Sequence, residues 1–265
     1  MYSLLLGAIA GDICGSSYEH TVGRTKNYDS VQLIRTDNGF TDDTVCTIGI
    51  AAALIENSCP TAEEFGKSLQ KYCKMYPHRG YGGMFKKWID NPVPYNSYGN
   101  GSAMRVSPCG LFAKTKEECL RLATRSAACS HDHPEGIKGA RAIALAVFFA
   151  KHGYDKAVIR KEVLDEYYPN YSNKTLNDIR PDYHFDVTCQ GSVPIALLAF
   201  LESKDYEDCL KLAISMGGDS DTIAAMAGGI ALPYYGAMTK KLENATYDIL
   251  PEEILDVIEE FEDYI

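Results

Sequence analysis

Two short acidic motifs contain the residues best suited to hold metal ions. Phe40-Thr41-Asp42-Asp43-Thr44 and Gly217-Gly218-Asp219-Ser220-Asp221-Thr222 each come directly before an alanine-rich stretch. Asp and Thr are good helix N-caps, and acids are favourable in a first helical turn. One cap needs only one side chain, however, so paired carboxylates flanked by threonines exceed that need. The motifs therefore favour metal binding over simple capping.

The spacing of these acids predicts a shared cation site. Asp219 and Asp221 are one residue apart, so both carboxylates can reach one centre from a turn that Gly217 and Gly218 allow to bend. Converging carboxylates without cations would repel one another and take up protons. Oxygen-only ligands favour Mg²⁺ or Mn²⁺ over zinc, and the pattern lacks the ligand run of an EF-hand. We therefore expect two such cations.

Glu19 and residues 97–105 can each be interpreted in two ways. Glu19 follows a Gly-containing helix end, and it is either a solvated loop acid or a mobile carboxylate that reaches the metals or a substrate. Residues 97–105 read Ser-Tyr-Gly-Asn-Gly-Ser-Ala-Met-Arg. Their glycines would expose backbone N–H groups that suit a diphosphate, although an ordinary Asn-Gly turn has the same sequence.

Ser130-His131-Asp132-His133-Pro134 contains an H-x-H pattern that binds zinc in some barrel hydrolases. Here the pattern lies between two predicted helices, and no barrel strands are predicted. A substrate contact or a helix cap is therefore the preferred interpretation of these histidines.

Taken in order, the motifs resemble those of the ADP-ribosylglycohydrolase family, which includes dinitrogenase reductase-activating glycohydrolases and arginine- and serine-directed ADP-ribosyl hydrolases. The resemblance covers about residues 1–235. It is carried by five segments of moderate individual specificity: 11–19, 40–44, 99–105, 130–134 and 217–222.

The resemblance implies an all-α hydrolase with a binuclear Mg²⁺ or Mn²⁺ centre. It would cleave the N- or O-glycosidic bond between ADP-ribose and a protein side chain or other acceptor, and release ADP-ribose. The implied catalytic set is Glu19, Asp42 and Asp43, with Glu19 helping to activate water or to protonate the leaving group. The implied metal ligands are Thr41, Asp42, Asp43, Asp219, Asp221 and Thr222. Contacts to ADP-ribose would come from Ser97, Tyr98, Gly99, Asn100, Gly101 and His131.

Two other functions stay open at this point. The first is a catalytically silent ADP-ribose-binding or crystallin-like structural protein, which the presence of all four metal-site Asp residues and Glu19 disfavours. The second is an all-α two-metal nucleotide phosphohydrolase, which usually has several E-x-x-E or H-D pairs on helices. We do not find that arrangement, since the H-D pair at 131–132 lies between predicted helices and the E-x-x-E at 259–262 stands alone. The acceptor, whether arginine, serine, a nucleic-acid base or a small molecule, is not specified by the sequence.

The segments that must position these residues are predicted to be helices. Apolar residues recur with helical periodicity over 4–14, 44–56, 61–75, 115–129, 134–152, 193–202, 206–216, 221–235 and 252–264. The segments from Thr61 and Thr115 open with capping-box patterns. Few segments alternate with period two, so we predict an all-α, compact orthogonal multi-helix bundle in one domain, 1–265. Residues 80–105 and 167–186 are predicted loops, long enough to be functional or disordered.

The composition of the chain limits the kinds of binding partner and the cellular location that we expect. The net charge of −10, with 26 Lys and Arg against 36 Asp and Glu and no basic run, disfavours general nucleic-acid binding. None of the nine cysteines is in a C-x-x-C motif, so buried free thiols in a reducing compartment are expected. No run approaches the ~20 apolar residues of a membrane span. The apolar start of the chain lacks the basic residues of a signal peptide. We therefore expect a cytoplasmic protein with no membrane contact.

Overall fold

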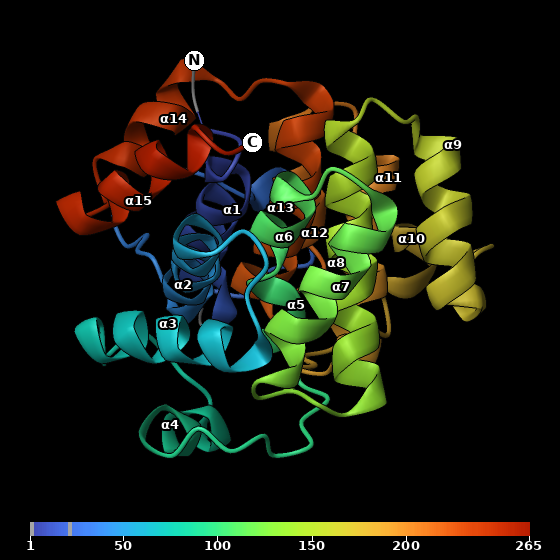
Figure 1. Cartoon of the computed structure of the whole chain (residues 1–265). Coiled ribbons are helices and arrows are strands. Elements are labelled where there is room, and N and C mark those ends of the chain that lie inside the picture. Colours follow the sequence, from blue (N-terminus) through green and yellow to red (C-terminus); the bar gives the residue numbers. More distant parts are fainter. Residues whose placement is uncertain (1–2, 21–22) are drawn as a thin grey trace.

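The computed structural model describes residues 3–20 and 23–265, and their regular structure is helical apart from one isolated bridge between Gly99 and Thr188 (Figure 1). The predicted all-α fold is confirmed. The α-helices are α1 (Leu6–Glu19), α2 (Asp42–Glu56), α3 (Ala62–Met75), α4 (Gly83–Asp90), α5 (Gly101–Met104), α6 (Ser107–Phe112), α7 (Lys116–Ala128), α8 (Pro134–Lys151), α9 (Lys156–Ile159), α10 (Leu176–Ile179), α11 (Cys189–Glu202), α12 (Tyr206–Ile214), α13 (Ser220–Tyr235), α14 (Lys240–Tyr247) and α15 (Glu252–Glu262). Short 3-10 or π segments are η1 (Tyr28–Ser30), η2 (Arg160–Asp165) and η3 (Pro169–Tyr171).

Helices α1 and α13 pack backbone to backbone near the centre of the bundle (Figure 1). Three glycines of α1, four residues apart, face α13. A Cβ added at Gly7, Gly11 or Gly15 would lie 2.5 Å or less from a backbone atom of α13. Residues four apart share one helix face, so these glycines form a contact stripe without side chains. The stripe places Asp12 of α1 close to the first turn of α13.

The starts of α2 and α13 meet at the same place. Thr41 is the N-cap of α2, and its hydroxyl accepts a hydrogen bond from the N–H of Asp43 at 3.2 Å. The chain enters α13 through Gly217, whose φ of 71° is a left-handed conformation that suits glycine. The Thr222 hydroxyl donates to Asp43 Oδ2 at 3.2 Å, which joins the two helix starts. Two positive helix ends therefore face one acidic region.

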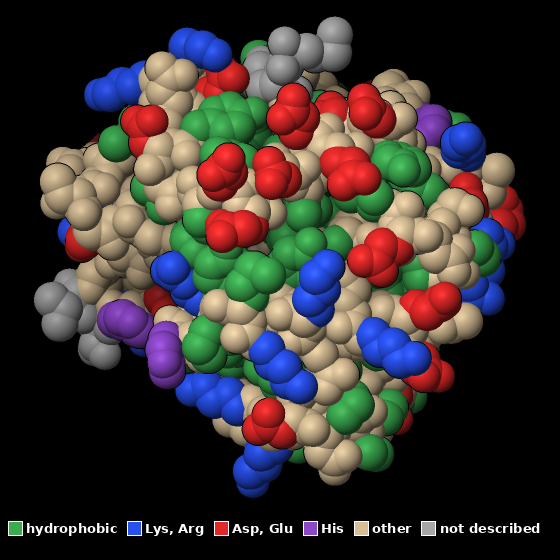
Figure 2. Space-filling view, turned by 60° about the vertical axis from the view of Figure 1, so that its left-hand side comes forward, with side chains coloured by type: hydrophobic (Ala, Val, Ile, Leu, Met, Phe, Trp, Pro, Cys, Tyr) green, Lys and Arg blue, Asp and Glu red, His purple; other side chains and the backbone are tan. Residues whose placement is uncertain are grey.

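One continuous cluster of buried hydrophobic residues runs from Leu5 before α1 to Phe261 of α15. Eight of the nine cysteines are buried free thiols, as expected, and Cys59 is exposed. None of the described helices is both long enough and apolar enough to span a membrane. On the face drawn in Figure 2, acidic side chains predominate above and Lys and Arg below, with hydrophobic side chains between them. Neither acidic nor basic side chains cover the whole of that face.

The predicted helices are present, but their bounds and number needed correction. Helix α1 continues five residues past the predicted end at residue 14, because its Gly15 still packs on α13. The predicted loop 80–105 contains α4, which buries Phe85, Trp88 and Ile89, and also α5. The predicted loop 167–186 contains η3 and α10. Helices α6, α9 and α14 were not predicted either. In α14, Lys, Glu, Asn and Thr leave only a short apolar stripe.

Candidate metal centre and ligand cleft

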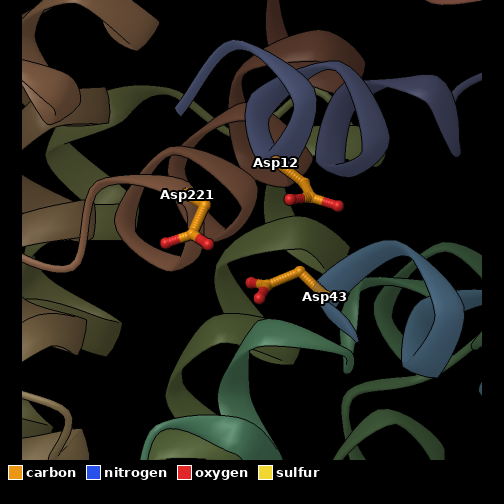
Figure 3. A group of neighbouring side chains, drawn as sticks. All are labelled: Asp12, Asp43 and Asp221. Atoms are coloured by element: carbon orange, nitrogen blue, oxygen red, sulfur yellow. The ribbon is translucent and has the colours of Figure 1, made fainter. Parts of the chain in front are cut away.

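Carboxylates from three helices converge where α1, α2 and α13 meet. Oxygens of Asp12, Asp43 and Asp221 all lie within 4.8 Å of one another, and Figure 3 shows the three side chains directed toward a common space. Oxygens of Glu19, Asp219 and Asp221 likewise lie within 4.8 Å of one another and form a second group. Asp221 belongs to both groups, so the geometry suits two neighbouring cations that share one ligand.

The electrostatics of the cluster also fit bound cations. Burial raises the pKa of Asp43 and Asp221 well above the usual value, and the neighbouring carboxylates raise it further. Burial and Asp12 raise the pKa of Asp42 to about 8. Asp43 Oδ1 is buried and has no hydrogen-bond partner among the described residues. Divalent cations would supply the positive charge that makes the ionised state favourable, and oxygen-only donors suit hard ions.

Asp12 had no role predicted from the sequence. Its side chain is fully buried and accepts hydrogen bonds from the Thr41 N–H at 2.9 Å, the Thr41 hydroxyl at 2.7 Å and the Thr44 N–H at 3.0 Å. The Thr44 hydroxyl donates to the same carboxylate. Asp12 therefore fixes the first turn of α2 against α1. An acid inside the otherwise apolar segment 4–14 was the available signal.

Glu19 is the last residue of α1 and not part of a following loop, which corrects the prediction. Its side chain is 31% exposed. Burial raises the pKa of this carboxyl, and Asp219 raises it further. The Arg24 guanidinium donates to the Glu19 carbonyl oxygen through Nε at 3.0 Å and Nη2 at 2.8 Å, which holds the backbone at the helix end. A half-buried acid at the edge of the cluster can exchange protons with solvent.

A cleft with a cavity of about 330 Å³ begins at this cluster. Five of the six predicted metal ligands line it: Asp42, Asp43, Asp219, Asp221 and Thr222. Thr41 is directed toward Asp12 and lines an adjoining cavity instead. Phe85, Tyr95 and His131 form an aromatic wall of the cleft, with Arg105 behind them. Phe185 lies beside Glu19 instead, because the Arg24 guanidinium, 4.3 Å from the Phe185 ring centroid, donates to the Glu19 carbonyl oxygen. The cleft thus has an acidic part and an aromatic part.

The predicted diphosphate loop lies along this cleft. Ser97, Gly99, Asn100 and Gly101 line it, whereas the ring of Tyr98 packs on His133 with centroids 5.2 Å apart and is not among the lining groups. Asn100 Nδ2 donates to Asp219 Oδ2 at 2.7 Å, which ties the loop to the acidic end. The Asn100 N–H donates to the Val187 carbonyl oxygen at 2.8 Å. The loop is therefore held from both sides.

The two histidines of the 130–134 motif have different surroundings. His131 is buried in the cleft wall, and its Nε2 would lie 3.0 Å from a Cβ added at Gly101. His133 is the N-cap of α8, and its Nδ1 accepts a hydrogen bond from the Glu135 N–H at 3.1 Å. The structure thus places one histidine in the cleft and one at a cap. Arg105, fully buried behind His131, was quoted in the loop motif but given no role.

A second cavity, of about 610 Å³, adjoins the first. Glu19, Asp42 and Gly80 line both cavities, so the acidic cluster separates them. Gly39 and Arg79 are among the other residues that line the second cavity. Arg79 lies over the Phe40 ring at 3.6 Å, and its carbonyl oxygen accepts from the Asp42 N–H at 2.7 Å. A molecule that reaches through the acidic cluster would extend into this space.

Comparison with known proteins gives one consistent family. The model of the ADP-ribosylglycohydrolase family matches residues 1–264. The chain is 28% identical to the ADP-ribosylhydrolase ARH3 of Homo sapiens, over 88% of this chain and 84% of that protein. It is 26% identical to the ADP-ribosylarginine hydrolase Tri1 of Pseudomonas putida, over 56% of this chain and 41% of that protein.

A solved structure has the same fold. A chain described as an ADP-ribosylglycohydrolase-related protein complex superposes with a TM-score of 0.76 at 21% sequence identity. The match covers 99% of this chain and 96% of the other. The helical arrangement that brings α1, α2 and α13 together is thus a known architecture.

Proposed function

Because this chain belongs to the ADP-ribosylglycohydrolase family, we propose that it hydrolyses the N- or O-glycosidic bond between ADP-ribose and an acceptor with the help of two Mg²⁺ or Mn²⁺ ions. The observation that carries the proposal is the sharing of Asp221 by two groups of converging carboxylates at one end of the cleft. The two relatives compared above are named as ADP-ribosyl hydrolases.

The cations would be held by the residues that begin α2 and α13, namely Thr41, Asp42, Asp43, Asp219, Asp221 and Thr222. Such ions supply positive charge that offsets the carboxylates and lowers the pKa of a coordinated water. Asp12 supports this set indirectly, because its hydrogen bonds orient Thr41 and Thr44.

The remaining residues orient ADP-ribose along the cleft. Gly99 and Gly101 allow close approach of the diphosphate to the loop, and the buried guanidinium of Arg105 adds a favourable positive potential. Phe85 and Tyr95 give the adenine apolar surfaces in the aromatic part of the cleft. This orientation places the distal ribose at the acidic cluster. Fixing the ribose beside its reaction partners accounts for a large part of the expected rate gain.

Glu19 is placed to move the proton. Its carboxyl lies at the boundary of the two cavities, next to the expected position of the bond to be cleaved. Its raised pKa brings proton uptake and release closer to neutral pH, where general acid–base catalysis is most effective. The bond to an anomeric carbon breaks through an oxocarbenium-like state, so protonation of the leaving group would assist.

Product analysis tests this function directly. With Mg²⁺ or Mn²⁺, ADP-ribosylated serine and arginine substrates should yield free ADP-ribose and the intact acceptor, and excess chelator should stop the reaction. Release of phosphate or AMP would instead indicate a nucleotide phosphohydrolase. A thermal shift with ADP-ribose but no turnover of any substrate would indicate a silent binding protein. Full turnover in excess chelator would overturn the metal requirement.

The second cavity would take the acceptor, since it lies beyond the acidic cluster from the proposed ADP-ribose site. Gly39 lines it, and a Cβ added at Gly39 meets no atom within 4 Å. Gly39→Phe should therefore fill the cavity without disturbing the fold. We expect kcat/KM for an ADP-ribosylated peptide to fall by about tenfold or more, because the acceptor is displaced. ADP-ribose linked to a single amino acid should be hydrolysed nearly normally.

Gly39→Ala serves as the matched control, because one methyl group leaves most of the cavity open. The informative quantity is the ratio of kcat/KM for the peptide and the single amino acid, measured for both variants. An unchanged ratio in Gly39→Phe would place the acceptor elsewhere.

A further inference from the structure

The imidazole of His131 has one hydrogen-bond partner whose role can be deduced from its surroundings. Ser130 Oγ lies 2.8 Å from His131 Nδ1. Either atom could carry the hydrogen, because a hydroxyl both donates and accepts and a neutral imidazole has one nitrogen of each kind. The other neighbours of Ser130 Oγ decide between the two arrangements.

Those neighbours are hydrogen-bond donors. Arg105 Nη2 lies 2.9 Å from Ser130 Oγ, and a guanidinium has no acceptor site. The Cys129 thiol lies 3.9 Å from Ser130 Oγ and 3.2 Å from the Ser126 carbonyl oxygen, so its hydrogen goes to that carbonyl. Nδ1 of His131 is therefore the best acceptor within reach of the Ser130 hydroxyl hydrogen. Ser130 accepts from Arg105 and donates to His131.

The direction of this chain fixes the tautomer of His131. If Nδ1 accepts, a neutral ring must carry its proton on Nε2. Nε2 faces the cleft beside the glycines of the loop, 3.0 Å from a Cβ added at Gly101 and 3.6 Å from one added at Gly99. The absence of side chains at both positions leaves the Nε2–H accessible from the cleft.

We infer that Arg105 and Ser130 are positioning residues that lock His131 as a neutral imidazole with its proton on Nε2, so that the ring presents a permanent hydrogen-bond donor to an acceptor oxygen of the ligand. The identity of that oxygen, on the diphosphate or the adjoining ribose of ADP-ribose, rests on the proposed function. The locked tautomer does not. A ring held in this way binds substrate and takes no part in proton transfer.

The surroundings of the ring support the neutral state. Burial lowers the pKa of His131 well below its ordinary value, and the charge of Arg105 lowers it further. Tyr95 also faces the ring, with its centroid 5.6 Å from that of His131, and the Cys129 thiol lies 3.9 Å from Ser130 Oγ. Asp132 is directed away, since its Oδ1 accepts from the Asn96 N–H at 2.7 Å. No carboxylate is thus seen to stabilise an imidazolium here among the described residues.

The test is nitrogen NMR of the full-length protein labelled at its six histidines, with His131→Gln used to assign the signal. The ligand-free wild type should show His131 with the proton on Nε2 and no titration between about pH 6 and 8. A proton on Nδ1, or a midpoint near the ordinary histidine value, would overturn the inference.

Ser130→Ala tests the positioning role. It removes the donor to Nδ1 and should allow a measurable population with the proton on Nδ1. Because that population presents a lone pair to the ligand, ADP-ribose should bind about tenfold more weakly. Ser126→Ala is the matched control, since Ser126 is another buried serine whose hydroxyl donates to the Ala123 carbonyl oxygen at 3.0 Å. Its affinity and tautomer should match the wild type.

The outcomes separate this inference from the proposed function. An unchanged tautomer and unchanged ADP-ribose affinity in Ser130→Ala would show that Ser130 does not position the ring. If the wild type fails to bind ADP-ribose, the proposed function fails, while the tautomer of the ligand-free protein still decides whether the ring is locked.

Discussion

Asp221→Ala is expected to lower turnover by about three orders of magnitude, the upper part of the range for losing one electrostatic element of an active site. Asp221 belongs to both groups of converging carboxylates, so its removal affects both proposed cation sites at once. Calorimetric titration with Mn²⁺ should show loss of tight binding, and single-turnover rates should fall in parallel. Retention of two tight metal sites would contradict the shared-ligand geometry.

The stability of the metal-free variant distinguishes this effect from unfolding. Asp221 is buried, and burial followed by Asp219 and Asp43 makes its ionised form unfavourable, as its raised pKa indicates. Removing it relieves that repulsion. Metal-free Asp221→Ala should therefore melt at the same temperature as the metal-free wild type or higher. Asp256→Ala, an exposed change on α15, is the control that should alter neither metal binding nor turnover.

Glu19→Gln is expected to lower turnover by roughly two orders of magnitude, the usual scale for a positioned acid or base. The amide has the same shape as the carboxyl but cannot exchange a proton. Because Asp43, Asp219 and Asp221 remain, Mn²⁺ and ADP-ribose should bind nearly as in the wild type. The comparison is metal and ADP-ribose calorimetry beside single-turnover rates, with Asp221→Ala measured in the same series.

Two results would contradict the role given to Glu19. Normal turnover in Glu19→Gln would mean that the carboxyl is a bystander at the helix end, and the proton would need another carrier. Loss of metal as complete as in Asp221→Ala would make Glu19 a ligand first, which its membership of the group with Asp219 and Asp221 permits.

The sequence was most informative where local signals are strong. Thr61 and Thr115 both cap their helices with the side chain, because a cap depends on residues only three positions apart. The complete predicted capping box forms at Thr61, whereas at Thr115 the Glu118 carboxylate accepts from the Lys114 N–H instead. The paired acids of the two motifs were assigned to one site because two acidic helix starts are unusual for caps alone. The structure brings Asp43 and Asp221 together as that interpretation requires.

Features that depend on tertiary contacts were not readable from the sequence. The role of Asp12 exists only because α1 packs beside the start of α2, and nothing near it in the sequence reveals Thr41 and Thr44 as partners. Helix α4 is only two turns long, and Gly82 and Gly83 at its start resemble a loop. The packing of Tyr98 on His133 also depends on residues far apart in the chain.

The glycine stripe of α1 affects how the proposed metal centre responds to amino-acid substitution. Gly15 packs against the backbone of Asp221 itself, with an added Cβ only 2.4 Å from its Cα. The interaxial distance between the two helices therefore sets how far Asp221 lies from Asp43, because the hydrogen bonds of Asp12 fix the first turn of α2 against α1, and with it the size of the cation that would fit between Asp43 and Asp221. A methyl group at Gly15 would enlarge that space although glycine offers no ligand atom. At the proposed metal centre, the preference for ionic radius would thus depend partly on positions that have no functional group, where a substitution would alter the preferred metal before it altered the chemistry.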